Sequence, residues 1–271
     1  MVDVIPGGSG SSLDVELVAA RAAALPGEIR AALADRGIRI VACRDNVTDY
    51  QPNMAELLPR NWPAGVTWSV VPGCFIPAQS VVVIATLGDD DERHIPAKGE
   101  KHGSFDLVIH EVMHADDILL QDNVWRRRSD NPQFRSAWAA DIAAQGFERY
   151  AYERAQAEEA YAESAARHFA GDDRLEVEWP AMAEFWRSTS YPVAVGETRR
   201  AIVSRGTHSV GTARALGEAG FQLDLVATSE DGIIGHALVA LEPGDAGYDA
   251  VDRQFSRRRD FGSEIIVLEP F

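Results

Sequence analysis

Cysteines are few in this sequence, and long apolar runs are absent. Its 271 residues include two cysteines, Cys43 and Cys74. Two thiols are too few for a disulfide framework or a cysteine-rich zinc cluster, so we expect buried thiols, with one disulfide between neighbouring strands as the alternative. No window approaches the roughly 18 uninterrupted apolar residues of a transmembrane helix. The N-terminus lacks the basic and apolar regions of a signal peptide, which predicts a cytoplasmic chain, one exported without a classical leader, or a mature form that has lost its leader.

Positive charge is also scarce. The chain has 26 Lys and Arg against 42 Asp and Glu, which gives a net charge of −16. So acidic a chain would be repelled by a polyanion, and we expect no nucleic-acid partner. The acidic run at 88–92 is expected to be solvated surface, with a cation site as the alternative. The apolar fraction of 46% is ordinary for a folded globular protein.

One motif stands out against this background, His110-Glu111-Val-Met-His114 in the run 107–117. At about 100° per residue the two imidazoles lie on one helix face, where they can bind zinc, and Glu111 can reach a water molecule held by the metal. The same pattern also arises by chance, usually on polar surface helices. This copy is embedded in apolar residues, and a polar stripe on a buried helix favours the zinc site.

The remaining patterns predict an α+β protein. Residues 1–12 are expected to be a flexible lead-in, 13–190 a mostly helical catalytic domain with a small sheet near its N-terminus, and 191–271 a small α+β unit. Helices are predicted at 13–36 (broken at Pro26), 105–121, 132–145, 147–170, 180–189, 209–218 and 247–257. Strands are predicted at 38–43, 66–71, 80–86, 199–204, 221–227, 232–241 and 264–269.

A catalytic zinc requires a third protein ligand, and the helix predicted at 147–170 offers candidates. Tyr152, Glu159 and Glu163 share one face if that helix is continuous, and small alanines near that face allow a close neighbour. The alternative is that these glutamates are solvent-facing charges paired with arginines one turn away. His94 and His102 are expected to be exposed loop residues. His168, His208 and His236 stand alone and are expected to be ordinary packed or surface histidines.

The two segments Ile109–Asp117 and Tyr152–Ala165 together resemble the peptidase domain of the anthrax toxin lethal factor family, a gluzincin family in which glutamate is the third zinc ligand. Pro-Pro endopeptidases and the Mlc titration factor share these catalytic segments. The resemblance covers roughly residues 36–190. Ser164 departs from the alanine usual at its position, and 191–271 has no counterpart.

The resemblance implies a role for each matching residue. His110, His114 and Glu159 would bind Zn²⁺, Glu111 would be the general base, and Tyr152 would donate its hydroxyl to the oxyanion. Each ligand imidazole needs an acceptor for its second nitrogen, and Glu163 and Asp117 are the candidates, although an ordinary surface role suits Asp117 equally well. Glu163 replaces Glu159 as the ligand if the helix shifts by one turn.

These residues predict a zinc-dependent endopeptidase that acts on a peptide or protein substrate through metal-activated water. Because several relatives are toxins, a secreted toxin or effector is one form of this prediction. The alternative is a catalytically silent or regulatory metal-binding interaction protein. Intact Glu111 and Tyr152 argue against it, since a purely structural metal site needs neither.

Overall fold

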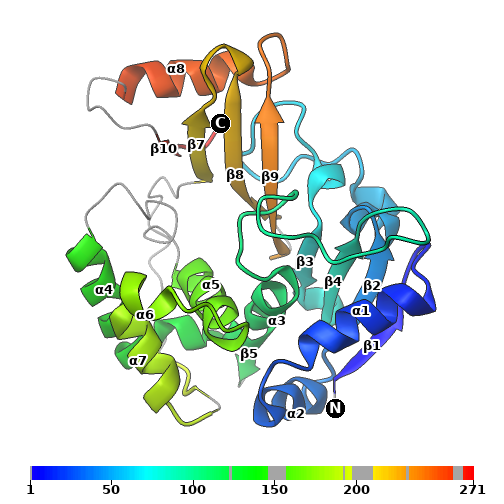
Figure 1. Ribbon diagram of the computed structural model, residues 1–271, viewed down its shortest axis with the longest axis vertical. Coiled ribbons are helices and arrows are strands. Elements are labelled where there is room, and N and C mark those ends of the chain that lie inside the picture. Colours follow the sequence, from blue (N-terminus) through cyan, green and yellow to red (C-terminus); the bar gives the residue numbers. More distant parts are fainter. Residues whose placement is uncertain are drawn as a thin grey trace.

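The computed structural model describes residues 2–121, 124–145, 157–191, 193–196, 210–229, 232–258 and 265–271. The chain alternates helices and strands at its N-terminus, continues through a largely helical middle, and ends in antiparallel strands (Figure 1). The described helices are α1 (Ser12–Ala22), α2 (Gly27–Asp35), α3 (Leu107–Asp117), α4 (Pro132–Gln145), α5 (Ala157–Phe169), α6 (Leu175–Glu178), α7 (Pro180–Ser188) and α8 (Tyr248–Arg258).

One mixed sheet runs through the described structure, in the order β1-β2-β4-β3-β9-β8-β7-β10. The pairs β1/β2 and β2/β4 are parallel, and all the other pairs are antiparallel. Its strands are β1 (Asp3–Pro6), β2 (Arg39–Arg44), β3 (Gly73–Ile76), β4 (Val81–Thr86), β7 (Gly211–Ala215), β8 (Phe221–Thr228), β9 (Ile234–Leu241) and β10 (Ile265–Leu268). A separate hairpin, β5 (Ile118–Gln121) and β6 (Val124–Arg127), follows α3 directly.

The predicted α+β class is confirmed, but the sheet is much larger than the small N-terminal sheet that we expected. Strands from both sides of residue 190 join it, because β9 pairs with β3. The meander β7–β9, with β10 beside β7, therefore continues the sheet of the N-terminal half. Figure 1 shows β8 and β9 running from the α8 end of the molecule down to α3.

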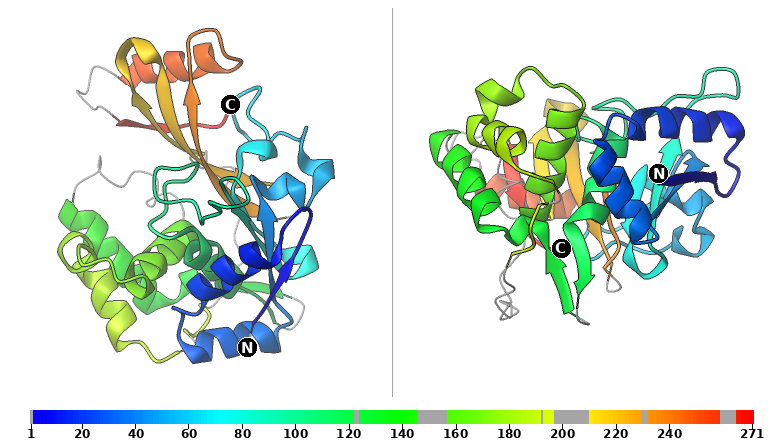
Figure 2. Two further views of the ribbon diagram at one scale, coloured as in Figure 1. Left: turned by 45° about the vertical axis from the view of Figure 1, so that its right-hand side comes forward. Right: turned by 90° about the horizontal axis from the view of Figure 1, so that it is seen from below.

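The sheet separates two hydrophobic cores. On β2, Ile40 and Ala42 pack with the helices of one face, while Val41 and Cys43 pack into the other core. Because both faces are covered, the parallel central strands are continuous apolar runs and do not alternate with polar residues. Figure 2 shows α1 and α2 (blue) on one side of α3 and α4–α7 (green to yellow-green) on the other.

Several predicted elements are wrong. Residues 3–6, expected in a flexible lead-in, form β1, since Val4 and Ile5 pair with β2. The strand expected at 66–71 contains the 3-10 turn Trp68–Val70, and the strand begins instead at Gly73. The helix expected at 105–121 ends at Asp117 and passes into β5.

Sheet pairing also overrides helix propensity in the C-terminal half. Residues 211–215 form β7, although their Ala-rich sequence suggested a helix, because the backbone pairs with β8 and β10 on its two sides. The helices predicted at 13–36, 132–145, 180–189 and 247–257 are confirmed, as are the strands predicted at 38–43, 80–86, 221–227, 232–241 and 264–269. The strand predicted at 199–204 and the helix segment at 147–156 lie outside the described residues.

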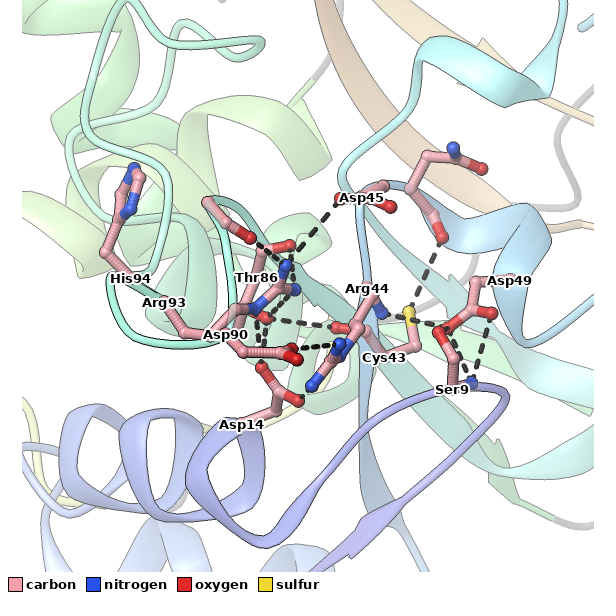
Figure 3. Close-up of polar contacts among 12 residues, drawn as sticks. Ser9, Asp14, Cys43, Arg44, Asp45, Asp49, Thr86, Asp90, Arg93 and His94 are labelled. Atoms are coloured by element: carbon pink, nitrogen blue, oxygen red, sulfur yellow. Dashed lines mark hydrogen bonds and ion pairs between the residues drawn. The ribbon is translucent and has the colours of Figure 1, made fainter.

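A polar cluster attaches α1 to the sheet (Figure 3). Asp14 closes the capping box of α1 with Ser11 and also bonds to Arg93 Nε at 3.0 Å and to Thr86 Oγ1 at 2.5 Å. These hydrogen bonds outweigh the opposing effect of burial and hold the pKa of Asp14 below its ordinary value. Asp90, in the predicted solvated run, bonds to Arg44 Nη1 at 2.6 Å.

Cys43 and Cys74 are buried and free, as predicted, and they lie on β2 and β3 with β4 between them. Burial raises the pKa of both thiols, which keeps them protonated and unreactive. Separately, none of the helices described here is long and apolar enough to span a membrane.

Candidate metal centre

The site is built on α3, which is held at both of its ends. Asp106 caps the N-terminus by accepting a hydrogen bond from Ile109 N at 2.8 Å. At the other end, the guanidinium of Arg36 donates to the carbonyl oxygen of Ile118 at 2.6 Å and to that of Ala115. Cationic donors at a helix C-terminus satisfy carbonyls that lack an intrahelical partner. The position of the two motif histidines is fixed by these contacts.

α5 packs against α3 and brings a carboxylate to the motif histidines. Glu159 Oε2 lies 3.6 Å from His110 Nε2 and 3.5 Å from His114 Nε2, and the two Nε2 atoms are 3.1 Å apart. Buried alanines on α5, including Ala162 and Ala166, allow the helices to approach closely. The three predicted zinc ligands therefore lie together, and Glu159 is the glutamate that faces the Nε2 atoms of both histidines.

Glu163 lies one turn further along α5, behind the first histidine. Its Oε2 is 3.2 Å from His110 Nδ1, the nitrogen that faces away from the cluster. Both of its oxygens accept from Phe105 N, at 3.1 and 3.2 Å. Glu163 therefore contacts the His110 ring through the nitrogen on its far side.

A fourth donor comes from β9, which the sequence did not suggest. His236 Nε2 lies 2.5 Å from Glu159 Oε2, and His236 Nδ1 lies 3.2 Å from Glu111 Oε1. One ligand atom from each of His110, His114, Glu159 and His236 falls within 4.8 Å of all the others. The expectation that His236 is an ordinary packed histidine is wrong, because sheet pairing brings it across 125 residues of sequence to Glu111.

Glu111 passes beneath β3 at a glycine. A Cβ on Gly73 would lie 2.8 Å from Glu111 Cγ and 3.0 Å from Leu107 Cδ1, closer than side chains tolerate. Glycine is therefore required for the glutamate to reach the cluster from this side. Glu111 is fully buried, and its Oε2 has no hydrogen-bond partner among the described residues.

One predicted residue, Asp117, is not part of this cluster, and another lies outside the described residues. Asp117 is fully buried and accepts from Ser129 N at 2.6 Å and Ser129 Oγ at 2.9 Å, so it anchors the turn after β6. The surface role that we considered for it is wrong, and its expected contact with a ligand histidine is not formed among the described residues. Tyr152 lies outside the described residues.

His94 and His102, in the loop before α3, do not join the cluster. His102 is buried, contrary to expectation, and its ring nitrogens lie 2.7 Å from Ser104 Oγ and 2.9 Å from the carbonyl oxygen of Pro96. His94 is exposed and lies 3.0 Å from Glu100, which raises the pKa of His94. Both histidines hold the loop that leads into α3.

Charge in the cluster is strongly coupled. Burial opposes protonation of His110, as does the charge of His236, but hydrogen bonds to Glu159 and Glu163 raise the pKa of His110 to about 9. Burial also opposes ionisation of Glu159, but the neighbouring histidines hold the pKa of Glu159 well below its ordinary value. An anionic carboxylate among imidazoles is a donor set that attracts a divalent cation.

The geometry fits a metal ion. In a tetrahedral zinc site with bonds of about 2.0–2.1 Å, ligand atoms lie roughly 3.3 Å apart, close to the 3.1, 3.5 and 3.6 Å found for His110, His114 and Glu159. His114 Nδ1 is buried and has no hydrogen-bond partner among the described residues. The 2.5 Å between His236 and Glu159 is a hydrogen-bond distance, too short for two ligands of one ion.

Comparison with known proteins relates this chain to an endopeptidase. No protein-family model matches it. The sequence is 31% identical over 125 residues to a Pro-Pro endopeptidase from Paenibacillus alvei, a match that covers 45% of this chain and 52% of that protein. The chain thus spans about half the length of that relative. The structure of the Pro-Pro endopeptidase PPEP-2 from Paenibacillus alvei is similar to it, with a TM-score of 0.53 and 26% identity, covering 68% of this chain and 95% of that chain.

Proposed function

We propose that this protein is a zinc-dependent endopeptidase of the gluzincin type. The observation that carries the proposal is the buried meeting of His110, His114 and Glu159 with Glu111 beside them. The relationship to a Pro-Pro endopeptidase supports hydrolysis of peptide bonds. His110 and His114 from α3 and Glu159 from α5 would hold the ion.

The chain's own residues supply the rest of the chemistry. A zinc ion held here would polarise the peptide carbonyl and lower the pKa of a water molecule toward ~7. Glu111 would act as the general base, taking a proton from the attacking water and giving it to the leaving amine. Glu163 keeps the His110 ring oriented so that Nε2 faces the cluster. Tyr152 remains the predicted donor to the oxygen that becomes negatively charged.

Peptides containing Pro-Pro are the first substrates to test, because the relative carries that specificity in its name. We expect cleavage of such peptides in a library digested by the zinc-loaded chain and analysed by mass spectrometry. A chelator should abolish the cleavage, and Glu111→Gln should keep the zinc but lose the cleavage. The proposal would be contradicted if the wild-type chain and His236→Ala both bind zinc but neither shows cleavage that a chelator abolishes.

One observation favours the rival class, a catalytically silent metal-binding protein. A site with four protein donors is typical of structural zinc, whereas catalytic zinc keeps one position open. His236 lies where such a fourth donor would stand, although its 2.5 Å contact with Glu159 Oε2 would have to lengthen before both side chains bind one ion. In a silent protein, replacing His236 would weaken metal binding without producing any hydrolysis. The role of a secreted toxin or effector, which the resemblance implies, stays a prediction.

A further inference from the structure

β9 lies beside β3 where a sheet edge would otherwise be open. β3 has β4 on one side, and on the other it pairs antiparallel with β9 through Gly73↔His236, Cys74↔Gly235 and Phe75↔Ile234. Without β9, the unpaired N–H and C=O groups of β3 would form an edge to which an extended peptide can add as a further strand. That edge runs directly over Glu111, as the contact between Gly73 and Glu111 shows.

His236 projects from this strand into the centre of the cluster. It contacts Glu159, the third predicted zinc ligand, and Glu111, the predicted base. Its ring centroid lies 4.4 Å from that of His110 and 5.4 Å from that of His114. The five side chains of the cluster are at most 3% exposed, so the predicted reaction centre is closed to a peptide in this conformation.

We propose that β9 is an internal blocking strand of this metal centre. It occupies the edge of β3 where an extended substrate would bind, and His236 fills the position that a catalytic metal must leave open for water. This inference rests on the proposed function and adds its regulation. Hydrolysis then requires β9 to leave β3. The chain therefore has no peptidase activity until an extended peptide displaces the strand.

The junction between β9 and β3 is narrow enough to open. Three residue pairs connect the strands, and a glycine permits their close approach. A Cβ on Gly235 would lie 2.6 Å from the carbonyl oxygen of Gly73 and 2.9 Å from Cys74 Cβ. All of β9 is paired with β8. β9 can therefore separate from β3 while it remains paired in the meander.

The first test measures access to the metal and does not depend on catalysis. The wild-type chain and His236→Ala are loaded with Co²⁺, and acetohydroxamate binding is followed by the visible spectrum of the metal. If the open conformation is populated at about 10% or less, removing the imidazole tightens acetohydroxamate binding by about tenfold or more. Ala240→Ser, an exposed position further along β9, should bind as the wild type does.

A second variant tests the strand pairing with the imidazole in place. Gly235→Ala forces β9 away from β3 but keeps His236, and it carries the test if His236→Ala fails to retain cobalt. It too should bind acetohydroxamate more tightly than the wild-type chain. Equal affinity in the wild-type chain and in the metal-loaded variants would overturn the proposal.

Hydrolysis of a Pro-Pro peptide then separates this inference from the proposed function. Tighter acetohydroxamate binding together with faster hydrolysis in the variants supports both. Tighter binding without hydrolysis in any variant supports blocking by β9 but contradicts the endopeptidase. Equal hydrolysis by the wild-type chain and the variants, with unchanged acetohydroxamate affinity, contradicts blocking and leaves the endopeptidase in place.

Discussion

Replacing Glu163 by glutamine should weaken zinc binding without unfolding the chain. Glu163 faces His110 Nδ1 at 3.2 Å and accepts from Phe105 N. Glutamine has the same length and keeps one acceptor for Phe105, but it removes the negative charge behind the ligand ring. Partners of this kind typically contribute 10–100-fold to metal affinity, so we expect zinc affinity to fall by about that factor, or about 1.4–2.8 kcal/mol.

The assay is a competition titration against a chromophoric zinc chelator at fixed pH, with circular dichroism to verify folding. Glu158→Gln is the matched control, because Glu158 is on the same helix but pairs with Arg127 at 2.6 Å. A half-exposed ion pair contributes about 1 kcal/mol or less to stability, and zinc affinity should stay unchanged in this control. Equal zinc affinity in Glu163→Gln and the wild-type chain would refute the reasoning that Glu163 supports His110.

Three further predictions concern stability. Asp14→Asn should lower the free energy of unfolding by about 3 kcal/mol at pH 7, because it removes the buried carboxylate of Arg93 and leaves it, among the described carboxylates, only the exposed Asp45 at 3.8 Å. Since the folded pKa of Asp14 is depressed, urea titrations should show the difference from wild type shrinking as the pH falls below about 4. A constant difference down to pH 2 would refute this. Ser164→Ala should lower the free energy of unfolding by about 1–3 kcal/mol, because the buried Ser164 Oγ accepts a hydrogen bond from Trp186 Nε1 at 2.9 Å. A free energy of unfolding that calorimetry finds unchanged would contradict this prediction. Zinc at about 100 times its dissociation constant should raise the free energy of unfolding by about 2.7 kcal/mol. Thermal unfolding measured with and without a chelator tests this, and the same melting temperature in both would contradict it.

Much of the site could be predicted because its pieces are local in sequence. The spacing of His110 and His114 places both on one face of α3. The spacing of Glu159 and Glu163 places both on one face of α5, and the family resemblance, not the spacing, indicated that they face the histidines. Each pair lies one turn apart on a helix, so the sequence carries the geometry. The amphipathic or apolar character of the buried elements likewise predicted most of the helices and strands.

His236 could not be predicted, because a single histidine on a strand carries no spacing signal. Its position depends on the pairing of β9 with β3, which joins residues 163 positions apart at Gly73↔His236. The size of the sheet was underestimated for the same reason, because the pairing of its strands joins distant residues and no local pattern encodes it. In β7, pairing on both sides overrides the helical preference of an Ala-rich segment.

We propose that Glu111 acts as the base beside a metal held by His110, His114 and Glu159. The direct measurement is the rate of Pro-Pro peptide hydrolysis by zinc-loaded chains with Glu111 or Glu111→Gln, in the wild-type and His236→Ala backgrounds. At equal zinc content, we expect the substitution to lower the rate by about 10²–10⁴-fold in every background that hydrolyses the peptide. Hydrolysis that continues at the same rate after Glu111→Gln would contradict the account.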